Sequence, residues 1–183
     1  RPDIISLLSS GKLLFDYEVS RVAFRDIGSS TNERSLISSV IPKGNFLANT
    51  LPYIEPFNYK MENGQIVQIF DEEREYYLLG LLNSFTMDYY VRQRITSHLN
   101  FFFIYELPIP DASGESKKRI ISLAKNLMKD PSNKQKRSEL EILIAKELFK
   151  LSKEEMEHIL DSFVYGNIDG ELTKLIKDRY EET

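Results

Sequence analysis

The sequence predicts an α+β fold: a small mixed or antiparallel β-sheet body with one central buried helix, followed by a C-terminal helical tail. Short apolar runs separated by turn residues fill residues 1–70, as in β-rich chains. A nearly continuous apolar stretch covers 72–96, and apolar residues recur at helical spacing from residue 116 onward. A composition shift near Asp111 divides the chain into a body, 1–110, and a tail, 111–183.

The first well-defined strand is expected at residues 21–26, and a polar loop follows it. Alternation would place Val22, Phe24 and Asp26 on one face and Arg21, Ala23 and Arg25 on the other. Small polar side chains bond their own backbone and tolerate turn angles, which makes residues 28–32 a loop. Its sequence is Gly28-Ser29-Ser30-Thr31-Asn32.

Three more strands are expected in the body. Residues 36–41 are β-rich and stop at Pro42, which cannot donate to a ladder. Residues 46–53 and 65–70 are further short strands. Asn63-Gly64 is a turn signal in front of the last of them.

A helix is expected from residue 72 to about residue 96. Asp71 can cap its N-terminus, and Glu72, Glu73 and Glu75 lie in the first turn, where the helix dipole favours negative charge. The rest of the segment has almost no polar face. A helix that is apolar nearly all round is buried, so this element should be the centre of the core.

After this helix we expect one more strand and then only helices. The strand is residues 100–107, sequence NFFFIYEL, closed by Pro108-Ile109-Pro110. Helical spacing resumes at Ser116, breaks at Pro131-Ser132 and continues in a longer helix. Ser152-Lys153-Glu154-Glu155 is a capping box that begins a short helix through Phe163.

Composition indicates an ordinary globular protein of one domain, or one domain with an appendage. The chain has 183 residues, is 42% hydrophobic and contains no cysteine, which excludes disulfides and cysteine-ligated metal sites. We expect a cytoplasmic location and no membrane contact, because no signal peptide and no run of about 18 apolar residues is visible. The chain begins at Arg1 rather than Met, as expected for a fragment of a longer protein.

Charge is distributed unevenly along the chain. The net charge is −4, whereas a DNA-binding protein is usually basic. Residues 114–137 nevertheless hold eight Lys or Arg against two acidic residues, and residues 138–183 hold six basic and twelve acidic residues. The basic band is either a contact surface for an anionic partner or simply a solvated helix face.

Several blocks of sequence, in a consistent order and spacing, carry a resemblance to a known family. They are residues 21–27, 30–34, 39–42, 78–90 (LLGLLNSFTMDYY), 99–110 (LNFFFIYELPIP) and 140–163 (LEILIAKELFKLSKEEMEHILDSF). Together they resemble the C-terminal target-recognition (specificity) region of adenine-specific DNA methyltransferases, including the fused type II (IIG-like) restriction–modification enzymes. The helical end of the family normally carries an Asp about two or three residues before its first apolar pair, and Glu139 or Glu141 must take that part here.

The resemblance implies a DNA-binding fragment of a site-specific adenine-N6 methyltransferase from a prokaryotic defence system. Duplex DNA and the parent's missing N-terminal methyltransferase domain would be its partners. The parent would use S-adenosylmethionine and could also be an endonuclease. We expect no cofactor in this chain, because it lacks a glycine-rich loop for S-adenosylmethionine. It also lacks the Asn/Asp-Pro-Pro-aromatic motif that binds a flipped adenine. We therefore expect no catalytic residue here.

Other catalytic chemistry has little support in the sequence. Pro110-Asp111 and Glu115-Ser116-Lys117 superficially resemble a nuclease metal site, but the spacing is too short, and a polar loop entering a helix explains them. His98 and His158 are the only histidines and are far apart, so no zinc site is expected. No Ser/His/Asp arrangement is recognisable.

The candidate DNA-binding residues are those whose side chains can donate to base edges or phosphates. Arginine can be bidentate to guanine and asparagine to adenine, whereas Ser, Thr and Lys mostly contact the backbone. Arg25 could instead pair with Asp26 or Glu33, and Asn32 could simply be a turn residue. The set is Arg25, Ser29, Ser30, Thr31, Asn32, Arg34, Lys43, Asn45 and Asn49.

Two other functions stay open at this point. The chain could be a protein–protein interaction module that docks on a catalytic or partner subunit, which the acidic final third favours. It could also be an independent enzyme, although the missing motifs speak against that.

Overall fold

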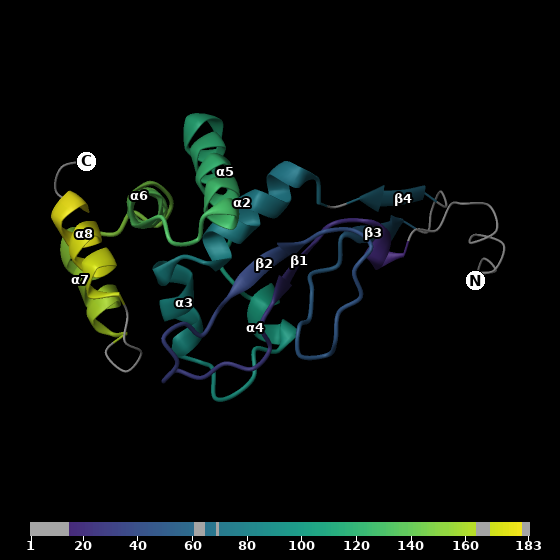
Figure 1. The fold of residues 1–183 in the computed structure, drawn as a ribbon, viewed down its shortest axis with the longest axis horizontal. Coiled ribbons are helices and arrows are strands. Elements are labelled where there is room, and N and C mark those ends of the chain that lie inside the picture. The colour runs from purple at the N-terminus through teal and green to yellow at the C-terminus, as the bar shows by residue number, and fades with distance from the viewer. Residues whose placement is uncertain (1–14, 61–64, 69, 164–168, 181–183) are drawn as a thin grey trace.

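The computed structural model describes residues 15–60, 65–68, 70–163 and 169–180. It confirms the α+β class, with antiparallel strand pairs in the body and helices at the C-terminal end (Figure 1). The elements are η1 (Asp16–Glu18), β1 (Arg21–Phe24), β2 (Ser38–Ile41), β3 (Phe57–Lys60), β4 (Gln65–Gln68), α2 (Glu72–Leu82), α3 (Phe85–Arg92), α4 (Phe101–Tyr105), α5 (Gly114–Lys129), α6 (Lys134–Leu143), η2 (Ile144–Leu148), α7 (Lys153–Asp161) and α8 (Gly170–Tyr180).

Strands β1 and β2 form an antiparallel pair at the centre of the body. The register pairs Arg21 with Ile41 and Phe24 with Ser38. All four residues of β1 are buried, so both faces of the strand are covered. The predicted strand at 36–41 is confirmed, with its first paired residue at Ser38.

The predicted strand at residues 46–53 is wrong. This segment is irregular, and only its end lies along the free edge of β1. There the N–H of Phe24 donates to the carbonyl of Pro52, and the N–H of Ile54 donates to that of Val22. Pro52 has no N–H to continue a ladder, which limits this edge to isolated bonds.

A second strand pair, β3–β4, lies apart from the first. Its register runs from Phe57 opposite Gln68 to Lys60 opposite Gln65. The strand predicted at 65–70 is confirmed over Gln65–Gln68, whereas β3 was not predicted. The predicted Asn63-Gly64 turn lies outside the described residues.

The single helix predicted over 72–96 is two helices, α2 and α3. Asp71 caps α2 as predicted, since its carboxylate accepts from the Arg74 N–H at 2.8 Å. Helix α2 ends at Asn83, and Ser84 caps α3 by accepting from the Met87 N–H at 3.2 Å. A second capping residue inside the apolar run therefore divides the predicted helix.

The strand predicted at residues 100–107 is also wrong, because the segment forms the short helix α4. Phe101 packs edge-on against Phe24 of β1, with ring centroids 5.6 Å apart. Aromatic residues favour strands only where they can pack on a sheet surface, and here packing of a helical turn on β1 overrides that preference. The helix stops before Pro108, as expected for a proline boundary.

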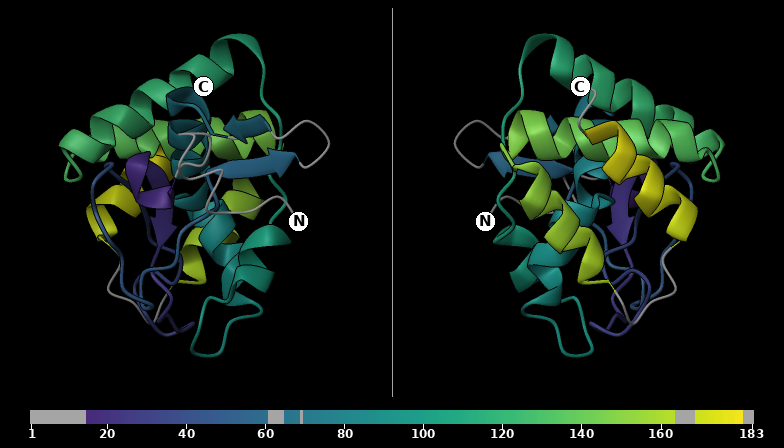
Figure 2. Two further views of the ribbon diagram at one scale, coloured as in Figure 1. Left: turned by 90° about the vertical axis from the view of Figure 1, so that its right-hand side faces the viewer. Right: turned by 90° about the vertical axis from the view of Figure 1, so that its left-hand side faces the viewer.

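The helical prediction after residue 116 is confirmed. Helix α5 ends before Pro131, and α7 begins with the predicted capping box, in which Ser152 and Glu155 bond each other's backbone N–H. In both views of Figure 2, α5 and α6 lie at one end and the loops that follow β1 and α3 at the other. Among the described residues, no helix has the length and hydrophobicity needed to cross a bilayer.

Candidate nucleic-acid interface

The loop after β1, residues 28–33, holds four of the nine predicted contact residues. Ser30, Thr31 and Asn32 are exposed, and the Asn32 N–H donates to the carbonyl of Ser29 at 3.1 Å. Asn32 Oδ1 accepts from the Ser29 N–H at 2.7 Å, which closes a compact turn. Gly28 is buried, and a Cβ there would lie 2.8 Å from the Ser35 carbonyl, so the close approach needs glycine.

Arg92 of α3 binds the backbone of this loop. Its guanidinium donates to the carbonyls of Ser30 at 2.8 Å, Glu33 at 2.6 Å, and Asn32. The same group lies 4.0 Å from the ring centroid of Phe163, a cation–π contact. Burial lowers the pKa of Arg92, and the charge of Asp88 opposes that shift. The 28–33 loop is thus fixed to α3 by one residue that sequence reasoning did not select.

Asp88 anchors the end of the loop. The carboxylate is fully buried and accepts from Arg34 Nε at 2.6 Å and from Arg92 Nε at 3.4 Å. It also accepts the backbone N–H groups of Ser35 and Leu36 at 3.1–3.3 Å. Hydrogen bonds to an ionised group are stronger than those between neutral groups, so Asp88 holds the end of the loop firmly against α3.

Arg34 and Arg25, both predicted DNA contacts, point into the protein. The Arg34 side chain is 15% exposed and donates to the carbonyls of Asn83 and Ser84 as well as to Asp88. Arg25 donates to the Arg34 carbonyl at 2.5 Å. The predicted alternative partner of Arg25, Asp26, is instead 2.9 Å from His98. Both arginines therefore position the loop.

A second buried carboxylate, Glu141, joins the C-terminal helices to the same region. It accepts from the Phe85 N–H at 2.8 Å and from Arg137 Nε at 2.9 Å, and Arg137 also donates to the Asn83 carbonyl. Glu139 lies at the surface and pairs with Arg119. Of the two glutamates considered in the sequence, Glu141 faces the β-rich body.

The remaining predicted residues lie elsewhere. Lys43 and Asn45 are exposed in the turn after β2, where the Asn45 amide donates to the Pro42 carbonyl at 3.0 Å. This turn is at the opposite end of β1–β2 from the 28–33 loop. Asn49 is exposed next to Thr50, whose carbonyl accepts from Asp26. The candidates therefore form two groups rather than one surface.

The basic band of α5 and α6 is largely neutralised by intramolecular partners. Lys125 lies 3.0 Å from Glu72, and Lys134 lies 2.7 Å from Asp169. Lys117 pairs with Asp111, and Arg119 with Glu139. Such exposed pairs contribute little stability, but they remove charge that phosphates could use. This arrangement favours the solvated-face interpretation for most of the band.

No catalytic cluster is found among the described residues. No group of three His, Asp or Glu side chains there could hold a metal ion. Asp111 pairs with Lys117 at 3.6 Å rather than with a second carboxylate. His158 contacts the Tyr89 hydroxyl at 3.3 Å. The second group of the predicted nuclease-like pattern, Glu115, is an exposed residue of the first turn of α5.

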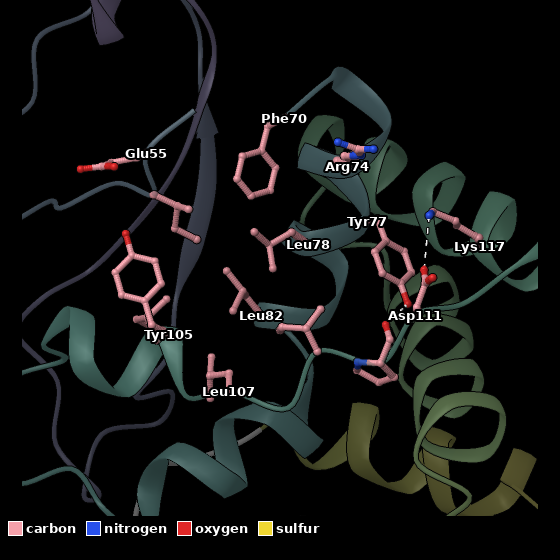
Figure 3. A pocket seen from close by; sticks show the side chains of 14 residues that line it. Glu55, Phe70, Arg74, Tyr77, Leu78, Leu82, Tyr105, Leu107, Asp111 and Lys117 are labelled. Atoms are coloured by element: carbon pink, nitrogen blue, oxygen red, sulfur yellow. Dashed lines mark hydrogen bonds and ion pairs between the residues drawn. The ribbon is translucent and has the colours of Figure 1, made fainter. Parts of the chain in front are cut away.

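Sequence reasoning missed an apolar pocket of about 520 Å³ between the body and α5 (Figure 3). Leu78 and Leu82 of α2 lie at its floor, with Glu55 and Tyr105 on one side and Lys117 on the other. Its walls come from segments far apart in sequence, so no local pattern could reveal it. A scan against protein-family models and a search of curated proteins found no match to this chain.

Proposed function

We propose that this chain is the DNA target-recognition fragment of a type II restriction–modification adenine-N6 methyltransferase. It would bind duplex DNA and position it for the catalytic domain of the parent. One observation carries the proposal: the exposed side chains of Ser30, Thr31 and Asn32 stand on a backbone fixed by Arg92 and Asp88. The blocks of sequence that resemble the family's specificity region add to it.

A fixed loop suits recognition because binding then costs little conformational entropy. Each loop carbonyl bonded to Arg92 is ordered before a partner arrives. The exposed hydroxyl and amide groups could donate to base edges or phosphates. In this proposal Ser30, Thr31 and Asn32 contact DNA, while Arg34 and Arg25 position the loop.

The charge balance indicates that this fragment contributes selectivity more than affinity. Phosphate contacts by Lys and Arg dominate the salt-dependent part of DNA binding. Lys43 is the exposed cation among the predicted residues, and it lies away from the 28–33 loop. The parent's catalytic domain would supply further phosphate contacts, together with the S-adenosylmethionine site.

The proposal is tested in the full-length parent by replacing Ser30, Thr31 and Asn32 together with alanine. We expect methylation to spread to non-cognate sites or to fall at the cognate site by about tenfold or more, since one good base contact gives about 1–3 kcal/mol of discrimination. S-adenosylmethionine affinity should not change. The readout is methylation mapped across a plasmid, with Lys129→Ala of α5 as the matched surface control.

A methylation profile identical to wild type in the triple-alanine variant would overturn the role of the loop. Arg92→Lys gives a second readout, because lysine keeps the charge but its single compact ammonium group cannot reproduce the spread, planar donors by which the guanidinium bonds three carbonyls and Asp88 together. This variant should broaden site choice while the protein stays folded, as judged by circular dichroism.

A second function, a protein–protein interaction module, is favoured by the apolar pocket of Figure 3. Ligand and partner sites are usually concave and apolar, with a few polar groups at the rim. The two functions occupy different surfaces and are compatible within one parent protein.

A further inference from the structure

Helix α4 exposes an unusual amount of aromatic surface. Phe102 is 63% exposed, Tyr105 61% and Phe101 43%, and Ile109 in the following linker is 43% exposed. The rings of Phe101 and Tyr105 are stacked, with centroids 5.9 Å apart. Contiguous exposed apolar surface of this kind marks interaction sites in monomeric proteins.

This aromatic face continues into the pocket of Figure 3. Tyr105 and Ile109 belong to both, and the pocket floor adds Leu78, Leu82 and Leu107. We call the combined surface the α4 groove; its members are Phe101, which stacks on Tyr105, and the residues that line the pocket, Tyr105 and Ile109 among them. The volume of about 520 Å³ is enough for two or three apolar side chains.

The polar groups on the far wall of the α4 groove are already satisfied. The Tyr77 hydroxyl donates to the Pro110 carbonyl at 2.7 Å and accepts from the Ala112 N–H at 3.1 Å. Lys117 pairs with Asp111 at 3.6 Å and lies 5.3 Å from the Tyr77 ring centroid. This wall therefore offers shape and apolar area to an occupant rather than hydrogen bonds.

The near edge of the α4 groove carries negative charge. Glu55 is exposed beside Tyr105. Partial desolvation of the phenol raises the pKa of Tyr105, and the carboxylate of Glu55 raises it further. None of the described residues forms an ion pair with Glu55. Glu106, next to Tyr105, lies 3.9 Å from Arg94 in a half-exposed pair. Figure 3 shows the Glu55 side chain directed outward from the pocket.

These charges distinguish a protein occupant from nucleic acid. Exposed aromatic side chains can stack on bases, but DNA would bring phosphates next to Glu55. Of the two cations that line the pocket, Lys117 is paired with Asp111, and Arg74 lies across the pocket from Glu55 (Figure 3). A polypeptide with a lysine or arginine near its apolar residues would instead neutralise Glu55. Arginine and aromatic residues are also typical anchors of protein interfaces.

We propose that the α4 groove binds a polypeptide segment that inserts two or more aliphatic or aromatic side chains and places a Lys or Arg against Glu55. This inference rests on the second proposed function, the interaction module, whose occupant it specifies. It is independent of the proposed DNA contact, because the 28–33 loop contributes no residue to the α4 groove.

The experiment selects binders from a displayed library of random dodecapeptides against this chain. Enriched peptides should contain an apolar pair and a basic residue within about four positions. Fluorescence polarisation then measures one enriched peptide against variants. Tyr105→Ala and Glu55→Lys should each weaken binding by about tenfold or more. Changing the peptide's basic residue to Glu should restore affinity for Glu55→Lys.

Phe46→Ala is the matched control, because Phe46 is an 81% exposed aromatic outside the α4 groove and should leave binding unchanged. Circular dichroism and thermal melting check that each variant is folded. Three results would overturn the proposal. They are no enrichment of any peptide, peptide affinity that neither Tyr105→Ala nor Glu55→Lys changes, and displacement of the peptide by a short DNA duplex. The last result would assign the surface to nucleic acid.

Discussion

The buried carboxylate of Asp88 fixes the positions of several other groups. The carboxylate joins two arginines and two backbone N–H groups, and it has no exposure to solvent. Removing the charge would leave the Arg34 and Arg92 guanidinium groups buried side by side. A single buried carboxylate thus controls both the 28–33 loop and the start of α3.

We predict that Asp88→Asn destabilises the protein by about 3–5 kcal/mol, the usual cost of leaving buried charges unpaired. Urea unfolding followed by circular dichroism measures it. Glu139→Gln is the control, since Glu139 pairs with Arg119 at the surface and its loss should cost under about 1 kcal/mol. Equal effects of the two variants would contradict the assigned importance of burial.

Glu75 gives a pH-dependent prediction. It is 2% exposed in α2, and burial raises its pKa above the ordinary 4.5, although hydrogen bonds from Ser20 oppose that shift. A raised folded-state pKa favours the protonated form, so the contribution to stability is present below about pH 4.5 and is lost as pH rises through the folded-state pKa.

Glu75→Gln cannot ionise and should therefore gain stability relative to wild type between about pH 4 and about pH 7. Urea midpoints at both pH values test this. Glu73→Gln, in the same helix turn but exposed, is the control for replacing a glutamate at this end of α2. If the Glu75→Gln difference were constant with pH, the assigned burial effect would be wrong.

The structure separates the residues that the sequence grouped as contact candidates around the 28–33 loop. Ser30, Thr31 and Asn32 are exposed, whereas Arg34 is mostly buried. The partner of Arg34 is 54 residues away in sequence, so no local pattern could show the pairing. Arg92 was missed for the same reason.

Helices α2 and α5 pack closely against each other at Gly80. A Cβ at this position would lie 2.9 Å from Ile120 Cγ2 and 3.6 Å from the Cβ of Ala124. Helix propensity alone would favour alanine over glycine by about 1 kcal/mol. The branched Ile120 is fully buried and has little room to move.

We therefore predict that Gly80→Ala is destabilising by about 1–3 kcal/mol despite its better helix propensity. Gly170→Ala, in the first turn of α8 with no atom within 4 Å of the added Cβ, should be neutral or stabilising. Thermal melts of the two variants provide the comparison. Stabilisation by both would show that α2 and α5 can separate slightly without cost.

Element types were predictable wherever a local signal existed. The caps at Asp71 and Ser152 and the break at Pro131 were recognised from sequence, and all are present. The Asn83-Ser84 break had a signal that was overlooked, namely two cap-forming residues inside an apolar run. By contrast, the helical state of α4 depends on packing against Phe24, which sequence alone cannot show.

For the whole molecule, α2 and α3 connect three clusters of buried side chains. Leu78 and Leu82 pack with the strands and α4, whereas Tyr77 and Leu81 pack with α5 and α6. Phe85 of α3 packs with α7 and α8. Because both helices belong to more than one cluster, the clusters cannot lose order independently.

We predict a single cooperative unfolding transition for the whole chain. Far-ultraviolet circular dichroism, which reports helices, and tyrosine fluorescence should give the same midpoint, as expected of two-state unfolding. A body of residues 15–110 produced alone should aggregate, since it would expose Tyr77 and Leu81. Two separate transitions would mean that the helical tail is an independent domain.

The hydrogen bonds between Arg92 and the 28–33 loop determine which donors and acceptors of the loop remain free to bind a partner. Arg92 occupies three loop carbonyls, and Asn32 Oδ1 is taken by the Ser29 N–H. These four acceptors of the loop are thus occupied, whereas the amide NH2 of the exposed Asn32 is a donor that no loop acceptor takes up among the described residues. A base edge rich in acceptors, such as N7 and O6 of guanine, matches this polarity better than the amino edge of cytosine.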